Sequence, residues 1–116
     1  FSGAASVTVE KDLGEFNLPS RLLFPLGIIV NEVLTNAMKY AFTGREEGVI
    51  SISTRKEGGR ITIAVRDNGA GLPDGFDIGT STGFGLTLVK MLCKQISASL
   101  SVESSGGTMT VISFQA

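Results

Sequence analysis

Residues 60–71 read RITIAVRDNGAG, an alternating strand that runs directly into a glycine-rich segment. Ile61, Ile63 and Val65 share one face of this strand, because successive side chains of a strand point to opposite faces. The same period of two places Asp67 on that apolar face. A carboxylate directed at a core has to be paired or hydrogen-bonded, since an unpaired buried charge is costly. Asp67 is therefore a candidate binding residue, and the alternative is that the Asp-Asn-Gly sequence is only a turn.

Hydrophobic periodicity on either side of this segment predicts two helices and four further strands. The expected strands are 6–10, 49–56, 60–67, 100–103 and 108–114, and the expected helices run from Phe24 or Pro25 to Phe42 and from Gly83 to Ile96. Gly-Gly pairs at 58–59 and 106–107 predict hairpins, and residues 68–82 are expected to form a loop. We therefore expect an α+β fold: a two-layer α/β sandwich with a mixed, mostly antiparallel sheet and helices on one face.

The composition is that of one ordinary domain. The chain has 116 residues, a mass of 12.1 kDa, a net charge of −1 and 42% hydrophobic residues, enough for a single core. It lacks the basic stripe typical of nucleic-acid binders. Its longest apolar runs are far shorter than the roughly 20 residues of a membrane span, so no direct membrane contact is expected. Because the first residue is Phe1, we expect a piece of a longer protein.

Histidine is absent, and Cys93 is the single cysteine. These counts exclude histidine-based acid–base chemistry, a Ser/His triad, a disulfide framework and any standard zinc site within the chain. A lone thiol fits a reducing, cytoplasmic compartment. We assign Cys93 to core packing, because it falls on the apolar side of the predicted helix 83–96. That side is expected to comprise Leu88, Val89, Leu92, Cys93 and Ile96.

The first predicted helix, which should stop before Gly44, has two distinct stripes on a wheel of about 100° per residue. The core stripe comprises Val30, Val33, Leu34, Ala37 and Ala41. The opposite stripe carries Glu32, Asn36 and Lys39, with Tyr40 at its edge. Asparagine is a poor helix former and needs a reason to be there, and the oxygens of Glu32 and Asn36 suit a hard cation such as Mg²⁺. The alternative is an ordinary solvated helix face.

Residues 83–86, Gly-Phe-Gly-Leu, open the second predicted helix. Glycines at a helix start let backbone N–H groups approach a ligand, and a helix N-terminus attracts phosphate. A short Gly-x-Gly is equally compatible with a tight turn. Neither the P-loop pattern nor a dinucleotide-binding G-x-G-x-x-G after a strand occurs.

Taken in order, these segments resemble the motifs of the GHKL ATPases, which include gyrase, heat-shock chaperones, histidine kinases and mismatch-repair proteins. Residues 31–42, NEVLTNAMKYAF, resemble the N-box; 67–73, DNGAGLP, the first glycine box; 83–86 the second; and 106–108, GGT, the last. The chain is most similar to the catalytic ATP-binding domain of a bacterial sensor histidine kinase. The resemblance implies the Bergerat ATP-binding fold, with ATP and Mg²⁺ as cofactors.

The resemblance also implies a role for each matching position. Asn36 would hold Mg²⁺ bridging the phosphates, Lys39 would lie near the phosphates, and Tyr40 would lie against the adenine. Asp67 would accept the adenine amino group, and Thr108 would complete the pocket floor. The remaining ATP-binding positions that it implies are Gly69 and Gly71 near the base, Leu72 at the start of a lid over residues 72–82, and Gly83, Phe84, Gly85 and Leu86 at the phosphates.

By the same resemblance, the domain presents the γ-phosphoryl group of Mg-ATP to a histidine on a separate dimerisation domain, with a response regulator downstream. Without a histidine, the chain cannot phosphorylate itself in this way. Glu32 would polarise the incoming histidine, and the alternatives are assistance to Mg²⁺ or a remnant of an ancestral hydrolase. The competing functions are an anti-sigma-type serine kinase, a degenerate ATP-binding regulatory module, and a hydrolytic clamp with a longer lid.

Overall fold

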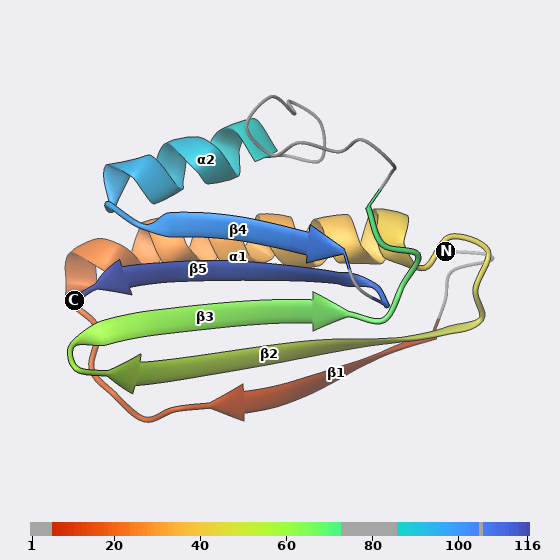
Figure 1. Cartoon of the computed structure of the whole chain (residues 1–116), viewed down its shortest axis with the longest axis horizontal. Coiled ribbons are helices and arrows are strands. Elements are labelled where there is room, and N and C mark those ends of the chain that lie inside the picture. Colours follow the sequence, from red (N-terminus) through yellow and green to blue (C-terminus); the bar gives the residue numbers. More distant parts are fainter. Residues whose placement is uncertain (1–5, 73–85, 105) are drawn as a thin grey trace.

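Within residues 6–72, 86–104 and 106–116, which the computed structural model describes, five strands form one sheet and two α-helices pack against it (Figure 1). The strands are β1 (Ser6–Leu13), β2 (Glu47–Glu57), β3 (Arg60–Asp67), β4 (Ser99–Ser104) and β5 (Thr108–Gln115). The helices are α1 (Leu23–Asn36) and α2 (Leu86–Gln95). A 3₁₀ turn (Ser20–Leu22) precedes α1, and a π-helical turn (Ala37–Ala41) follows it.

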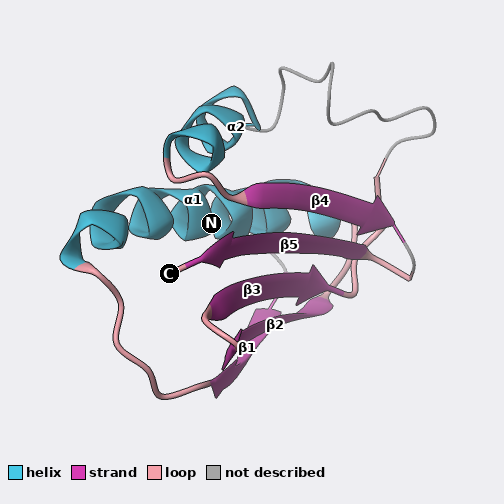
Figure 2. Ribbon diagram, turned by 60° about the vertical axis from the view of Figure 1, so that its left-hand side comes forward, coloured by secondary structure: helices cyan, strands magenta, loops and turns pink. Residues whose placement is uncertain are grey.

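The sheet has the strand order β1-β2-β3-β5-β4. β1 and β2 run parallel, with Ser6 opposite Glu47, while each of the other neighbouring pairs is antiparallel. A parallel pair needs a crossover connection, and α1 supplies it. Both helices lie on the same face of the sheet (Figure 2). The expected α+β sandwich, with a mixed, mostly antiparallel sheet and helices on one face, is confirmed.

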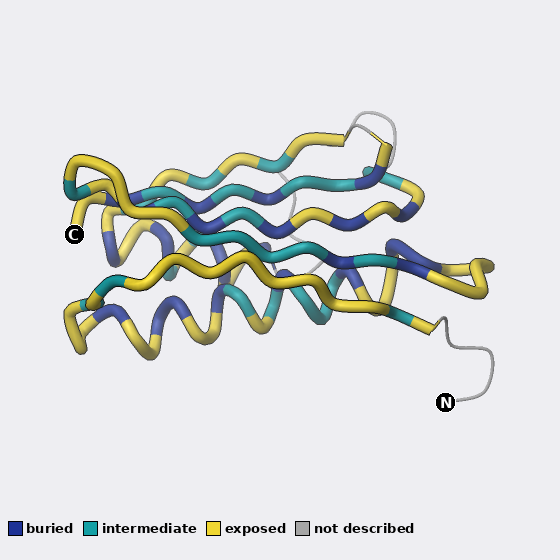
Figure 3. Tube along the Cα trace, turned by 90° about the horizontal axis from the view of Figure 1, so that it is seen from below, coloured by how far each residue is buried: buried dark blue, intermediate teal, exposed yellow. Residues whose placement is uncertain are grey.

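Apolar side chains between the two layers form two buried clusters. The first comprises Leu22, Leu26, Ile29, Ile61, Ile63, Val89, Cys93, Ile96, Ile112 and Phe114. The second comprises Val33, Ala37, Ala41, Phe42, Ile50 and Val65. Buried positions recur along the helices and the central strands, whereas β1 is exposed along almost its whole length (Figure 3). The clusters therefore fix the helices over the central strands of the sheet.

The helical segment Ser20–Ala41 is longer than the apolar runs of the sequence suggested. Its 22 residues and mean hydropathy of 1.2 would suffice to cross a membrane by length and composition alone. However, Leu22, Leu26 and Ile29 are buried in the first cluster, which is how the core helix of a two-layer fold behaves. The segment stops where the sequence predicted, since Gly44 has a φ of +76°, a conformation that glycine adopts without strain.

α2 is described from Leu86 onward, and residues 83–85, where the predicted helix opened, lie outside the described residues. Val89 and Ile96 are buried as expected, but Leu88 is 40% exposed. The expectation for Leu88 is wrong because the buried residues of α2 form a narrow stripe of Leu86, Val89 and Cys93, and a residue next to Val89 is rotated from it by about 100°.

Cys93 belongs to the first core cluster. Its side chain is buried, and burial raises the pKa of its thiol. The thiol therefore stays protonated near neutral pH and packs as a small apolar group. The assignment of Cys93 to core packing is confirmed.

Candidate functional site

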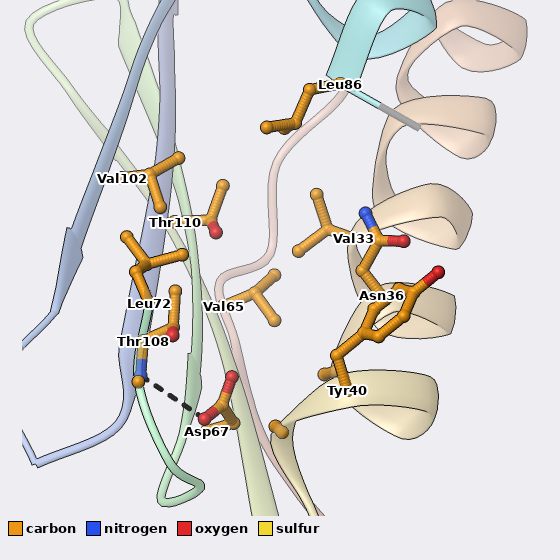
Figure 4. Close-up of a pocket in the computed structure, with 13 residues that line it drawn as sticks. Val33, Asn36, Tyr40, Val65, Asp67, Leu72, Leu86, Val102, Thr108 and Thr110 are labelled. Atoms are coloured by element: carbon orange, nitrogen blue, oxygen red, sulfur yellow. Dashed lines mark hydrogen bonds between the residues drawn. The ribbon is translucent and has the colours of Figure 1, made fainter. Parts of the chain in front are cut away.

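A cleft of about 190 Å³ opens between the helices and one end of the sheet (Figure 4). α1 and the π-helical turn supply one wall, and the ends of β3, β4 and β5 supply the other. The lining residues are Val33, Asn36, Ala37, Tyr40, Ala41, Val65, Asp67, Gly71, Leu72, Leu86, Val102, Thr108 and Thr110. Most of these side chains are apolar, so the few polar ones decide what the cleft can bind.

Asp67, the last residue of β3, carries the negative charge of this cleft and is only 7% exposed. Its Oδ1 accepts hydrogen bonds from the N–H of Gly69 at 2.9 Å and from the N–H of Thr108 at 3.2 Å. Within the described part of the chain, both bonds to the carboxylate go to Oδ1, and Figure 4 shows the other oxygen directed into the cleft. Asp67 is therefore both a turn residue and a cleft residue, so the two sequence interpretations are compatible.

Asn68 fixes the course of the chain after Asp67. Val49 donates its N–H to Asn68 Oδ1 at 2.8 Å, and the Asn68 N–H donates to the Val49 carbonyl at 3.2 Å. Nη1 of Arg45 donates to the Asn68 carbonyl at 2.9 Å. These bonds attach the segment to β2 while Asp67 attaches it to β5. The carboxylate is therefore held in place from both sides.

Gly69 packs directly against the π-helical turn. The N–H of Ala70 donates to the Ala41 carbonyl at 3.0 Å, and a Cβ on Gly69 would collide with that same carbonyl oxygen. Gly69 is buried and is not one of the lining residues. Its lack of a side chain therefore serves the close approach of two backbone segments.

Gly71 lies two residues further on and lines the cleft. Its φ is +82°, and a Cβ there would collide with Ser104 Oγ. That hydroxyl accepts the N–H of Leu72 at 3.1 Å. Residues 69–72 are therefore held between the π-helical turn and β4.

The helix wall of the cleft carries Asn36 and Tyr40, which lie about one turn apart (Figure 4). Tyr40 is 51% exposed, so its ring lies at the mouth of the cleft. Lys39 is exposed and Glu32 is half-buried, and neither is a lining residue. The roles expected for Lys39 and Glu32 stay predictions.

The donor set of the cleft can contribute to a Mg²⁺ site but cannot form one alone. Among the described residues, no group of three or more His, Cys, Asp and Glu side chains could hold a metal ion. Asn36 offers an amide oxygen, which is a suitable ligand for a hard cation. Mg²⁺ in proteins usually keeps several waters and is bound together with substrate phosphates. The residues present therefore fit a cation that arrives with a phosphorylated ligand.

Several predicted site residues come together here. Asn36, Tyr40, Asp67, Gly71, Leu72, Leu86 and Thr108 all line the cleft, whereas Gly83, Phe84 and Gly85 lie outside the described residues. Val65, Val102 and Thr110 also line the cleft and are not among the predicted site residues. The alternation of β5 could have revealed Thr110, which shares a face with Thr108. Val102 could not have been found, because its place depends on the pairing of β4 with β5.

The arrangement suits a flat, largely apolar group that carries an amino donor. Val33, Ala37 and Val65 supply apolar surface from both layers. The inward-facing oxygen of Asp67 can accept a hydrogen bond at the floor. Because that oxygen lies in a mostly apolar cleft, a hydrogen bond to it is stronger than one to a carboxylate in water.

Comparisons with known proteins agree with this geometry. Residues 24–116 match the family of histidine kinase-, DNA gyrase B- and HSP90-like ATPases. Blue-light-activated histidine kinase 2 of Erythrobacter litoralis is 33% identical over 95% of this chain, which spans 31% of that relative. An anti-sigma F factor of Geobacillus stearothermophilus is 33% identical over 60% of this chain and 48% of the relative.

A solved structure of a histidine kinase is also similar to this chain. The Erythrobacter litoralis EL346 blue-light activated histidine kinase superposes with a TM-score of 0.88 at 29% identity, over 97% of this chain and 36% of that one. The chain thus spans less than half the length of each of these three relatives.

Substituting Gly69 by alanine is expected to lower the free energy of unfolding by about 1–3 kcal/mol, the usual cost of an extra methyl group in packed surroundings. Gly27→Ala is the matched control, because Gly27 lies in α1 with nothing within 4 Å of the added Cβ. That variant should gain about 0.5–1 kcal/mol. Urea denaturation measures both. Equal stability of Gly69→Ala and the parent chain would contradict the close packing of this segment.

Proposed function

The chain belongs to the family of histidine kinase-, DNA gyrase B- and HSP90-like ATPases, and from this membership we propose that its cleft binds Mg-ATP and presents the γ-phosphoryl group to a histidine outside the chain. The observation that carries the proposal is the buried Asp67, held by two backbone N–H groups at the floor of an apolar cleft. Such a carboxylate has a fixed direction and one oxygen available to a ligand.

Asp67 supports recognition of adenine in particular. The exocyclic amino group of adenine is a donor, and the carboxylate oxygen that faces the cleft is an acceptor. Guanine would place a carbonyl oxygen at the same position, where two acceptors repel. Val33 and Val65 would lie against the ring, and Tyr40 would cover it at the mouth.

The phosphates would lie toward Asn36 and the beginning of α2. The amide oxygen of Asn36 would coordinate Mg²⁺, which supplies charge neutralisation on the phosphates when bound. The cationic end of Lys39, which is exposed one turn away, would contribute a further positive charge. Backbone N–H groups of residues 83–86 would donate to phosphate oxygens, as helix N-termini do.

The phosphoacceptor has to come from elsewhere, because the chain contains no histidine. The similar protein from Erythrobacter litoralis is named a histidine kinase, and this chain spans 31% of it. We propose that a separate domain supplies the acceptor imidazole, that Glu32 polarises it on approach, and that a response regulator receives the phosphoryl group afterwards. The reaction would take place in the cytoplasm, where ATP is available.

A second candidate is a serine kinase that acts on a partner protein. It is favoured by the similarity to an anti-sigma F factor, which is 33% identical over 60% of this chain. The chemistry of the product separates the two candidates. Phosphohistidine is lost in acid and retained in alkali, whereas phosphoserine is retained in acid. The expected product is the acid-labile one.

Asp67→Asn is expected to weaken ADP binding by roughly 1.5–3 kcal/mol, the usual worth of a hydrogen bond to a charged group. The asparagine oxygen can still accept from Gly69 and Thr108, so the fold should survive while the amide donor repels the adenine amino group. Calorimetric titration with ADP, with GTP as the control ligand, measures the effect. Asp12→Asn on the exposed strand β1 is the matched control. Unchanged affinity in Asp67→Asn would refute the role of the carboxylate.

Asn36→Ala is expected to remove the Mg²⁺ dependence of ADP binding, because the variant lacks the protein ligand of the cation. Titrations of ADP with and without Mg²⁺ should then give the same affinity, while circular dichroism shows an intact fold. Asn31→Ala, at an exposed position of the same helix, is the control and should keep the dependence. A folded Asn36→Ala variant whose binding still needs Mg²⁺ would contradict the assigned role.

A further inference from the structure

Thr110 is a buried polar residue that lines the cleft, and the proposed function assigns it no role. Among the residues that the structure describes, Asp67 and Thr110 are the buried polar or charged ones, with exposed fractions of 7% and 6%. β5 places Thr110 opposite Val65 of β3 and Val102 of β4. All of these residues line the cleft. A hydroxyl is therefore set between two valines on the sheet wall.

Valine has nearly the same shape as threonine and would be the more favourable residue in these surroundings. Burying a hydroxyl costs free energy unless it forms a hydrogen bond. In the described part of the chain, the side chain of Thr110 makes no hydrogen bond to another residue. Every side-chain oxygen that is fully enclosed there has a hydrogen-bond partner, so the Thr110 hydroxyl is not fully enclosed. The hydroxyl is thus open to the cleft, and Figure 4 shows its oxygen on the cleft side. A group bound in the cleft can be its partner.

The strand register sets the distance between this hydroxyl and Asp67. Asp67 lies opposite Thr108 on the neighbouring strand, and Thr110 follows two residues later on the same face of β5. Asp67 and Thr110 are therefore diagonal neighbours, about 7–8 Å apart. A fused two-ring base spans this distance, with its amino group at one end and ring nitrogens along its edges. Asp67 and Thr110 can therefore contact one base at two separate points.

We propose that Thr110 is a specificity-determining residue, whose hydroxyl donates a hydrogen bond to a ring nitrogen of the base that Asp67 holds by its amino group. This inference rests on the proposed function, because it takes an adenine nucleotide as the ligand. It adds a second contact on the sheet wall, so that the cleft recognises both the amino group and a ring acceptor.

The first test compares Thr110→Val, Thr110→Ser and the parent chain by calorimetric titration with ADP. Thr110→Val keeps the shape and removes the donor, so ADP should bind about 3- to 10-fold more weakly, the range of a single hydrogen bond. Thr110→Ser keeps the hydroxyl and should lose less affinity. Thr62→Val is the matched control, because Thr62 lies on the opposite face of the neighbouring strand, beside Ser113. It should bind ADP like the parent chain.

Thermal unfolding without ligand separates a binding role from a structural one. Thr110→Val should be at least as stable as the parent chain, because it replaces a buried hydroxyl by a methyl group of the same size. Weaker binding together with a clear loss of thermal stability would overturn the proposal, since the hydroxyl would then serve the fold.

Deaza analogues of ADP, in which CH replaces N1, N3 or N7, identify the acceptor atom. One of these analogues lacks the acceptor nitrogen, so even the parent chain cannot form the Thr110 hydrogen bond to it. For that analogue, the parent chain and Thr110→Val should bind with about the same affinity. Equal ratios for ADP and all three analogues would overturn the proposal, as would ADP affinity in Thr110→Val equal to that of the parent chain. If the parent chain itself binds no ADP, the proposed function fails first.

Discussion

One carboxylate oxygen joins the ends of two strands. Asp67 Oδ1 accepts backbone N–H groups from Gly69 and Thr108, so it closes the turn after β3 and ties this turn to the start of β5. The cost of burying the charge is thereby offset by two charge-assisted hydrogen bonds. The second oxygen is then available at the floor of the cleft. We propose that folding and ligand recognition depend on this same side chain, through different atoms.

The glycines around this carboxylate bring backbone segments closer than side chains would allow. A Cβ on Gly69 would meet the Ala41 carbonyl, and a Cβ on Gly107 would meet the Asp67 carbonyl. The π-helical turn, the end of β3 and the last hairpin therefore converge at one point. Ala41 and Asp67, which take part in these contacts, also line the cleft. Gly69 and Gly107 of this chain accordingly act as packing constraints.

Local periodicity was enough to predict the fold class and several residues on both walls of the cleft. The period of two in β3 predicted the buried position of Asp67, and the helix wheel predicted the core positions Val33 and Ala37. The pairing of distant strands could not be predicted in this way: Val102 lines the cleft because β4 pairs with β5, and no local pattern encodes that pairing. The π-helical turn could not be predicted either, and Tyr40 lies in that turn and not in α1.

We propose that an adenine nucleotide binds beside Asp67. Proton–nitrogen correlation NMR of the chain, titrated with ADP and Mg²⁺, tests this most directly, because the amides of Gly69 and Thr108 donate to that carboxylate. Their resonances should move by more than those of Arg55 and Thr62, which lie together on the opposite face of the sheet. Shifts confined to the opposite face, or no shifts at saturating ADP, would show that no adenine nucleotide binds beside Asp67.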